Sequence, residues 1–399
     1  MEDDALDRDA RIKLSIGTKQ QGDADGLFFS PLGLVFDHHR GLLLVTEFNN
    51  NRVQVFSCDD DDGASFVSKF GRHGDQPGQL LNPRGIAIDH DHDRILVVDT
   101  FNHRVQSWSL SEQSFLSCIG HQGSGDLEFK YPRGIAIDKH HRRIIIADTN
   151  NDRLVFLSSI DLSLLFSIGK YGSQPGEFDC PIGIAIDDDR HRIIVCDTRN
   201  HRVQVLSSID GSFLFEFGSR GNQPCQFDSP QGLCIANQGR IIVADTSNYR
   251  LQSFTHEGHH ISSFDCGFEM PSAVAFDEHR GLIGFSAGHR VHVIGANQWL
   301  ADTFTWRPDR HRHAPSWMKQ AVSTMTMIRS VVDDSSAMSM IPNELLFEIF
   351  SMLDVLESEL EAPLGHQHQS ETTTITTSSC GRSSTSMNNT KKKKKCTMM

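Results

Sequence analysis

The stretch Asn82-Pro83-Arg84-Gly85-Ile86-Ala87-Ile88-Asp89 sets the pattern from which the fold of this chain can be predicted. It joins a Pro-x-Gly sequence to a short apolar run, and further copies begin at Pro31, Pro132, Pro181 and Pro230, with Pro271-Ser272-Ala273 as a modified sixth. The glycines of the first five copies, Gly33, Gly85, Gly134, Gly183 and Gly232, are 52, 49, 49 and 49 residues apart. A period of roughly 40–50 residues, dense in short β-type runs, predicts four-stranded blades that close into a ring.

One complete unit can be followed from Asn82 to Gly120. Gly85–Asp89 is apolar on both faces, as expected of an inner strand between neighbouring blades. Arg94–Asp99 predicts a second strand, Arg104–Trp108 a third with alternating apolar and polar residues, and Phe115–Ile119 an outer strand. Gly120 then begins the crossing to the next blade, where glycine permits backbone angles that other residues resist.

A second phrase recurs between the predicted second and third strands. Its copies are Asp99-Thr100-Phe101-Asn102-His103-Arg104, Asp148-Thr149-Asn150-Asn151-Asp152-Arg153, Asp197-Thr198-Arg199-Asn200-His201-Arg202 and Asp245-Thr246-Ser247-Asn248-Tyr249-Arg250. These residues resemble the NHL repeat, which is named for Asn-His-Leu in this turn. The resemblance covers roughly residues 12–294, with weaker copies at Glu47–Arg52 and Phe285–Arg290, and implies an all-β, six-bladed propeller of NHL-type repeats over residues 1–300.

The repeated turn places a carboxylate, a hydroxyl and a guanidinium close together, which could be taken for a catalytic group. Repetition in nearly every blade favours a structural role instead. Asp and Thr cap tight turns, Asn tolerates the left-handed region, and Arg can brace the turn through a carboxylate. We therefore expect these residues to be part of the scaffold, and we expect no catalytic residue among them.

The ends of the ring must be joined for the propeller to close. Leu14-Ser15-Ile16-Gly17 is similar to Phe166-Ser167-Ile168-Gly169, which is predicted to be an outer strand with its crossing glycine. Since residues 12–17 precede the first Pro-x-Gly, they are predicted to complete the last blade beside residues 289–294. Residues 299–304 are a competing outer strand for the same place.

Composition limits the kinds of function. Residues 1–300 hold 27 Lys plus Arg against 40 Asp plus Glu, a net charge of −13, which disfavours generic attraction to nucleic acid. The nine cysteines include no CxxC pair, so neither a zinc finger nor a disulfide framework is predicted. The acidic first residues and the absence of an apolar run of about 20 residues favour a cytoplasmic protein without a membrane span.

A metal-dependent propeller hydrolase would need ligands just before the inner strands, facing the central channel. The residues preceding the prolines are Ser30, Asn82, Tyr131, Cys180, Ser229 and Met270. One amide is too few for such a ring, so no metal and no cofactor are predicted. The paired histidines at 38–39, 140–141 and 259–260 are expected to be solvated turn residues, and the acidic run 59–62 a hairpin insertion.

The C-terminal part of the chain has a different character. Residues 301–340 are predicted to be a linker with a short helix, and residues 341–358 an amphipathic helix. This helix resembles the opening of an F-box, which implies docking to the Skp1 adaptor of cullin-based ubiquitin ligases, but it lacks the later apolar helices of a complete F-box. Its matching residues are Pro342, Leu345, Leu346, Ile349, Phe350 and Leu353. The alternative is a helix that packs on the propeller.

Residues 365–399 are predicted to be disordered, because they are polar and rich in Ser and Thr. Five lysines at 391–395 precede Cys396-Thr397-Met398-Met399, a C-a-a-X arrangement in which Met favours farnesylation of Cys396. Lipid and lysines together would tether the chain to an anionic membrane surface. The alternative is a solvated or nuclear-import lysine run with a chance terminal cysteine.

Three functions follow from these features. The leading one is a non-enzymatic scaffold whose propeller binds a protein partner, with delivery to a ubiquitin ligase through the F-box-like helix. The second is binding of single-stranded RNA, which the resemblance to tripartite-motif NHL proteins implies, on a face expected to carry Arg72, Arg84, Arg133, Lys170 and Arg220. The third, a propeller hydrolase, is disfavoured by the missing channel ligands.

Overall fold

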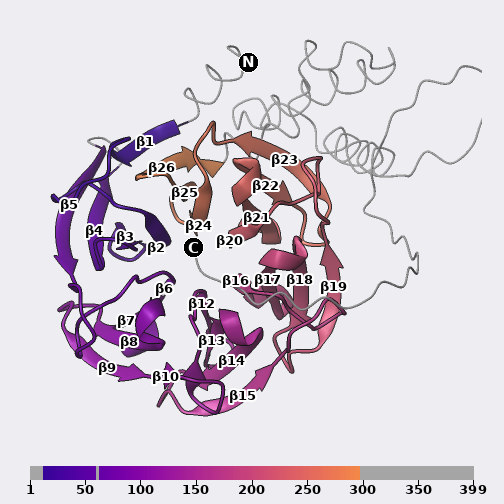
Figure 1. Ribbon diagram of the computed structural model, residues 1–399. Helices are drawn as coiled ribbons and strands as arrows, with labels where there is room; N and C mark the ends of the chain where they lie inside the picture. Colours follow the sequence, from indigo (N-terminus) through magenta and orange to yellow (C-terminus); the bar gives the residue numbers. More distant parts are fainter. Residues whose placement is uncertain (1–11, 60–62, 297–399) are drawn as a thin grey trace, which may run out of the picture. The chain divides into compact units, whose positions relative to one another are not determined.

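The computed structural model describes residues 12–59 and 63–296, which form six antiparallel sheets of four strands each around a central axis (Figure 1). Each sheet is one blade. In blades 1 to 5 the four strands follow chain order from the axis to the rim. The prediction of an all-β, six-bladed propeller is confirmed.

The strands of the first three blades agree closely with the repeat seen in the sequence. Blade 1 is β2 Pro31–Asp37, β3 Leu42–Glu47, β4 Arg52–Asp59 and β5 Gly63–Phe70; blade 2 is β6 Ile86–Asp89, β7 Arg94–Asp99, β8 Arg104–Ser109 and β9 Phe115–Ile119; blade 3 is β12 Ile135–Asp138, β13 Arg143–Asp148, β14 Arg153–Ser158 and β15 Leu164–Ile168. A short parallel pair, β10 His121–Gln122 and β11 Glu128–Phe129, lies in the crossing between blades 2 and 3.

The other three blades repeat the arrangement. Blade 4 is β16 Pro181–Asp187, β17 Arg192–Asp197, β18 Arg202–Ser207 and β19 Phe213–Phe217; blade 5 is β20 Pro230–Ala236, β21 Arg240–Asp245, β22 Arg250–Phe254 and β23 His260–Asp265; blade 6 is β24 Pro271–Asp277, β25 Leu282–Ala287, β26 Arg290–Gly295 and β1 Ile12–Gly17. Short 3-10 turns connect many of the strands: η1 His90–His92, η2 Thr100–Asn102, η3 Thr149–Asn151, η4 Asp188–Arg190, η5 Thr198–Asn200, η6 Asn237–Gly239 and η7 Thr246–Asn248.

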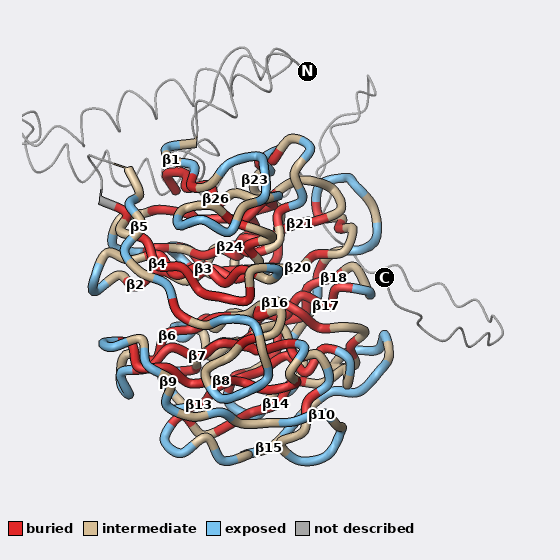
Figure 2. The backbone as a smooth tube through the Cα atoms, turned by 60° about the vertical axis from the view of Figure 1, so that its left-hand side comes forward, coloured by how far each residue is buried: buried red, intermediate tan, exposed pale blue. Residues whose placement is uncertain are grey.

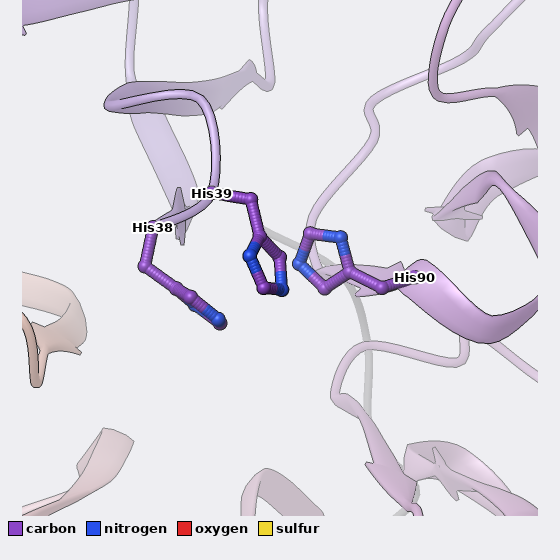
Figure 3. A group of neighbouring side chains, drawn as sticks. All are labelled: His38, His39 and His90. Carbon is purple, nitrogen blue, oxygen red and sulfur yellow. The ribbon is translucent and has the colours of Figure 1, made fainter.

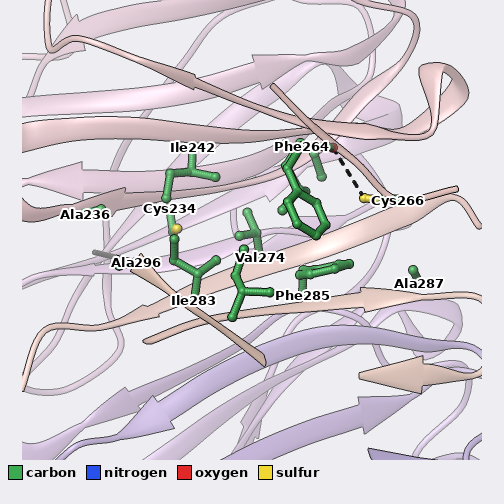
Figure 4. Close-up of a cluster of buried hydrophobic side chains, with 13 residues drawn as sticks. Cys234, Ala236, Ile242, Phe264, Cys266, Val274, Ile283, Phe285, Ala287 and Ala296 are labelled. Carbon is green, nitrogen blue, oxygen red and sulfur yellow. Dashed lines mark hydrogen bonds between the residues drawn. The ribbon is translucent and has the colours of Figure 1, made fainter. Parts of the chain in front are cut away.

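The hydrophobic core lies between neighbouring blades. All six residues of β7 and of β13 are buried, whereas the outer strands β9 and β15 alternate between half-buried and exposed residues, as the burial colours of Figure 2 show. Figure 4 shows one such layer, in which Phe264 of blade 5 packs against Phe285 of blade 6. Burial on both faces is what the apolar runs of the inner strands predicted.

The last blade is completed by the N-terminal part of the chain. Strand β1 pairs antiparallel with β26, with Ile16 opposite Val291 and Gly17 opposite Arg290. This is the pairing predicted for residues 12–17, and the side chain of Ile16 is buried against blade 1. The competing segment 299–304 lies outside the described residues.

The repeated turn between the second and third strands is held by a buried carboxylate that accepts hydrogen bonds from an asparagine, an arginine and a glutamine. We call this set of bonds the brace. Asp99 is fully buried, and its Oδ2 accepts hydrogen bonds from Asn102 Nδ2 at 2.9 Å, Arg104 Nε at 2.8 Å and Gln106 Nε2 at 2.9 Å. Its Oδ1 accepts the backbone N–H of Leu81 at 2.6 Å. The polar residue Gln106 of the third strand is therefore buried as well, because the brace satisfies its amide.

The arginine of each brace also holds the crossing that leads into its blade. The terminal nitrogens of Arg104 donate to the carbonyl oxygens of Asp75, Gln76 and Gln79 at 2.7, 3.0 and 2.9 Å. Equivalent carboxylate–arginine pairs occur in four other blades: Glu47–Arg52, Asp148–Arg153, Asp197–Arg202 and Asp245–Arg250. The expected scaffold role of the turn is confirmed.

Blade 6 lacks the carboxylate–arginine pair of the other five blades, in agreement with its degenerate copy of the turn. Ala287 stands where the other blades have a carboxylate. The arginine is kept, and Arg290 pairs instead with Glu269 at 2.5 Å, a residue of the crossing that precedes the blade. The charge of the arginine is thus balanced from a different part of the chain.

A second set of arginines, which the sequence analysis did not single out, links neighbouring blades on the opposite face. Arg94 of blade 2 donates to the carbonyl oxygen of Ser159 in blade 3, and Arg192 of blade 4 donates to that of His256 in blade 5 at 2.9 Å. The corresponding bonds are Arg143 to Ser208, Arg280 to Cys58 and Arg40 to Leu110.

The predicted linker at 301–340, the F-box-like helix at 341–358 and the tail at 365–399 lie outside the described residues. Within the part that is described, no helix has the length and apolar character needed to cross a membrane.

Deleting residues 1–17 is expected to lower the melting temperature by many degrees and to promote aggregation, because β26 would become an unpaired sheet edge. Differential scanning calorimetry with light scattering measures both effects. Deletion of residues 1–10 alone, which spares β1, is the matched control. Equal melting temperatures for the two truncated chains would contradict the role of β1 in closure.

Replacing Asp99 by alanine is expected to lower the free energy of unfolding by about 3–5 kcal/mol, since the guanidinium of Arg104 would remain buried without its carboxylate. Urea denaturation measures the loss. Asp75→Ala serves as the control, because that side chain is exposed and accepts a hydrogen bond from the neighbouring Gln76. A loss of the same size in both variants would argue against the brace.

Candidate binding site at the mouth of the central channel

The residue that follows the proline of each copy of the repeat lines the central channel. Leu32, Arg84, Arg133, Ile182 and Gln231 stand in the five Pro-x-Gly copies and Ser272 in the modified sixth, and they surround a cavity of about 100 Å³. The glycines make this ring tight, because a Cβ at Gly33 would lie 2.0 Å from the carbonyl oxygen of Arg84 and one at Gly85 would lie 2.3 Å from that of Arg133. Only glycine lets adjacent inner strands approach so closely.

The residues before the prolines, which the sequence analysis expected at the channel, do not line it. Ser30, Asn82, Tyr131, Cys180 and Ser229 have positive φ angles of 48–57°. Their backbone N–H groups are used by the preceding blade: Asn82 N donates to Asn51 Oδ1 at 2.8 Å, and Tyr131 N donates to His103 Nδ1 at 3.0 Å. The expectation failed because the left-handed turn places the following residue, not this one, on the channel wall.

Arg84 and Arg133 bring two positive charges together at the channel. Both side chains are half-buried, and the Nε of each is buried without a hydrogen-bond partner among the described residues. Burial, followed by the charge of Arg133, lowers the pKa of Arg84 to about 9, so that it is still protonated at neutral pH. Burial likewise lowers the pKa of Arg133. Two half-buried cations with unpaired donors lower the stability of the fold unless an anion or a hydrogen-bond acceptor binds between them.

Aromatic side chains continue from these arginines onto the face that carries the crossings. The guanidinium of Arg84 lies over the ring of Phe48, 4.7 Å from its centroid. Phe48 contacts Phe101 with a centroid distance of 5.8 Å, and Phe101 contacts Tyr131 at 5.2 Å. Phe101 is 42 % exposed, although it is a large hydrophobic residue. We call Arg84, Arg133, Phe48, Phe101 and Tyr131 the channel-mouth surface.

The other three predicted cations lie apart from this surface. Arg72, Lys170 and Arg220 follow the outer strands β5, β15 and β19, at the start of three different crossings, and all three are exposed. Lys170 Nζ pairs with Glu177 Oε1 at 3.3 Å. The structure thus joins Arg84 and Arg133 and leaves the remaining three at separate crossings.

The channel wall offers little for metal-assisted hydrolysis. No Asp, Glu or His is found among the described residues that line the cavity. Asp152, Asp179 and Cys180 gather near the crossing into blade 4, but their groups are already engaged. Asp152 Oδ1 accepts the N–H of Cys180 at 2.8 Å, Asp179 lies 3.8 Å from Arg199, and burial raises the pKa of the Cys180 thiol to about 11.

Two of the three histidine pairs lie close to a third histidine from the next blade. His38 and His39 converge with His90 from the next blade, and His140 and His141 converge with His191. The pair 259–260 does not take part in such a group among the described residues. The two groups form because turns from neighbouring blades meet where the inner strands end.

The sequence could have indicated the channel-mouth surface through one signal. The x position of Pro-x-Gly varies among Leu, Arg, Arg, Ile, Gln and Ser, while its neighbours are nearly constant. A variable residue inside a fixed scaffold is where binding specificity is placed. The aromatic members carried no such signal, since Phe48, Phe101 and Tyr131 occupy different positions of the repeat.

Comparison with known proteins supports the fold. The NHL repeat family matches residues 178–206 and 227–254, and a family described as a 6-bladed beta-propeller matches residues 29–122. No curated protein matches the sequence. NHL repeats in a six-bladed propeller are therefore found in this chain, as the sequence resemblance implied.

Several solved structures are similar to this chain in fold. A structural genomics protein of unknown function from Bacteroides thetaiotaomicron has a TM-score of 0.51 and 16 % identity, covering 70 % of this chain and 73 % of its own. A gluconolactonase from Xanthomonas campestris has a TM-score of 0.51 and 12 % identity, covering 68 % and 87 %. A catalytically inactive virginiamycin B lyase from Staphylococcus aureus, with quinupristin, has a TM-score of 0.48 and 12 % identity, covering 69 % and 82 %. At these identities the likeness concerns the fold alone.

Proposed function

We propose that this chain is a non-enzymatic binding scaffold, and that its propeller holds a protein partner at the channel-mouth surface. The observation that carries the proposal is the pair Arg84 and Arg133, whose buried Nε atoms have no acceptor among the described residues. A partner that places a carboxylate or a backbone carbonyl between them would satisfy both guanidinium groups. An acceptor that pairs with a buried donor otherwise left without a hydrogen bond contributes a large free energy of binding.

The composition of the surface supports a protein as the partner. Arginine and large aromatic residues are the side chains most often found at the energetic centre of protein interfaces. Here Arg84, Phe48 and Phe101 form a continuous row, with Phe101 exposed. The backbone beneath the row is rigid, because the turns of Phe48 and Phe101 belong to braced blades. A rigid surface loses little conformational entropy on binding.

The charge of the propeller favours a protein over a nucleic acid. Residues 1–300 carry a net charge of −13, so a polyanion is repelled at long range, whereas one carboxylate between two arginines is not. Single-stranded RNA is the second candidate for one reason: a row of aromatic rings beside arginines can stack bases. The hydrolase is disfavoured by a channel wall that has no carboxylate or imidazole among its described residues.

The C-terminal segments extend the proposal. The F-box-like helix at 341–358 would deliver the bound partner to a ubiquitin ligase through a Skp1-like adaptor, and the tail that carries Cys396 would hold the cytoplasmic chain at an anionic membrane. Both rest on the sequence alone.

Replacing both channel arginines, Arg84→Met with Arg133→Met, is expected to weaken partner binding by about 100-fold or more, which corresponds to about 2.8 kcal/mol or more and lies in the range of hot-spot residues. The variant should keep or raise the melting temperature, because it removes two half-buried charges whose Nε atoms have no hydrogen-bond partner among the described residues. Affinity capture with the full chain, followed by titration of the captured protein, measures the effect.

The control for this experiment is Arg72→Met with Arg220→Met, which removes two exposed arginines at the crossings and should leave affinity unchanged. Capture of the same protein by the wild type and both variants would refute the proposal. Crosslinking of RNA, lost in both variants, would favour the second candidate. Recovery of a Skp1-like adaptor by the wild type but not by Leu346→Ala with Ile349→Ala would support the delivery step, and its absence from all samples would remove that step.

Metabolic labelling with a farnesyl analogue is expected to label the wild-type chain and not Cys396→Ser, since the thiol of Cys396 is the group that farnesylation of a C-a-a-X arrangement modifies. Fractionation should move the labelled protein to membranes and leave the variant in the supernatant. An unlabelled wild-type chain would refute the lipid anchor without touching the scaffold proposal.

A further inference from the structure

A group of histidines meets on the face opposite the channel-mouth surface. His38 and His39 lie in the turn after β2 of blade 1, and His90 begins η1 of blade 2. Figure 3 shows the three imidazole rings turned toward one another from these two elements. The ring centroids of His39 and His90 are 4.4 Å apart, and those of His38 and His39 are 4.2 Å apart. Residues 51 positions apart in the sequence thus form one cluster.

The geometry of this cluster is close to that of a metal site. One ring nitrogen of each histidine lies within 4.8 Å of those of the other two. Imidazole nitrogens bound to one Zn²⁺ at 2.0–2.1 Å are about 3.3 Å apart in a tetrahedral site. The exposed side chain of His39 can close this difference by rotating, because packing does not fix it.

Nearby groups complete the site. The fully buried carboxylate of Asp37 lies behind the cluster, with its Oδ1 3.9 Å from His90 Nε2, and its Oδ2 has no hydrogen-bond partner among the described residues. At this distance the carboxylate makes no hydrogen bond to the ring, but its negative charge favours a cation bound there. His279 of blade 6 stacks on His38 with a centroid distance of 4.7 Å, and together with Glu278 offers further ligands.

Two of the three imidazoles, those of His38 and His90, have lowered pKa values, and the neutral imidazole is the form that binds metals. Burial, then the neighbouring His39 and His279, lowers the pKa of His38, against an opposing effect of Glu278. Burial also lowers the pKa of His90, and Asp37 opposes the shift. Lys139 of blade 3 adds a positive charge near both rings. The carboxylates of Asp37 and Glu278 counter that charge for an incoming cation.

The same arrangement recurs between blades 3 and 4. His140, His141 and His191 again bring one nitrogen each within 4.8 Å of the others. His141 Nδ1 lies 2.9 Å from Asp138 Oδ2, which leaves its Nε2 as the free ligand atom. The Nδ1 of His191 is buried and has no hydrogen-bond partner in the described part of the chain. A buried imidazole nitrogen without a partner is a place where a bound ion is expected.

We propose that the turns following the inner strands of blades 1 and 2 form a site for a divalent transition metal of the Zn²⁺ class, bound by His38, His39 and His90, and that His140, His141 and His191 form a second such site. Imidazole ligands select zinc, copper and nickel over magnesium and calcium. Three histidines leave one coordination position open for water or for a side chain of a bound molecule. The sites cross the boundary between blades, so a bound ion ties each pair of blades together.

Zinc titration of the full chain by isothermal calorimetry at pH 7.5 tests the proposal. Relative to the wild type, His39→Ala with His90→Ala is expected to lose one tightly bound equivalent, and His140→Ala with His191→Ala is expected to lose another. His73→Ala with His259→Ala, two exposed histidines outside the clusters, should lose none. At pH 5 both equivalents should disappear, because protons compete for the imidazole nitrogens.

Thermal melts with and without zinc distinguish a loss of zinc binding from a loss of folding. Without zinc each cluster variant should melt near the wild type; with zinc the wild type should gain more stability than either variant, because an ion that binds only the folded chain stabilises it. His39→Gln, a single change at an exposed side chain, repeats the test if a double variant fails to fold. Equal zinc stoichiometry in the wild type, cluster variants and control would overturn the proposal. The Arg84→Met with Arg133→Met variant should retain both equivalents, which separates this inference from the proposed function.

Discussion

The buried carboxylate of each Asp-Thr-x-Asn-x-Arg turn is the interaction on which the propeller depends. One side chain, such as Asp99, satisfies an asparagine, an arginine, a glutamine and a backbone N–H at once. The arginine it holds then fixes three carbonyl oxygens of the crossing. A crossing has little sheet of its own, only a short parallel bridge or the pair β10–β11, so these charge-assisted bonds help to give it one conformation.

A second constraint acts at the axis, where six inner strands meet. The glycine of Pro-x-Gly lets the carbonyl oxygen of the next blade approach to a distance that no Cβ would allow. The preceding residue is thereby placed on the channel wall, whatever its chemistry. The scaffold thus fixes where six side chains point and leaves their identity free. In this chain two adjacent positions are arginines, and their incomplete hydrogen bonding is the main reason to regard the channel mouth as a binding site.

The two faces of the propeller differ in the chemistry they offer. The face with the crossings carries arginine and aromatic side chains, suited to carboxylates and to broad contacts with a partner. The opposite face carries imidazoles backed by carboxylates, suited to a small cation. Because the blades are braced on both faces, by Arg104-type and by Arg94-type bonds, each site is held by a rigid frame. Binding at one face requires no rearrangement at the other.

The sequence by itself determined the number of blades, the strand boundaries and the role of the repeated turn. These follow from local physics: apolar runs mark strands buried on both faces, and glycine and Asp-x-x-Asn mark turns within one unit. It also indicated Ile12–Gly17 as the closing strand, because an outer-strand pattern without a blade has one free edge to pair with.

Only the tertiary structure decided which side chains come together across blades. Arg84 and Arg133 are 49 residues apart, and His39 and His90 are 51 apart, so no local pattern joins them. The sequence analysis placed the residue before each proline at the channel wall. Five of these residues have a left-handed backbone, and the residue after the proline lines the channel instead. Closure of the ring sets these contacts, since the distance between neighbouring blades depends on how all six pack around one axis.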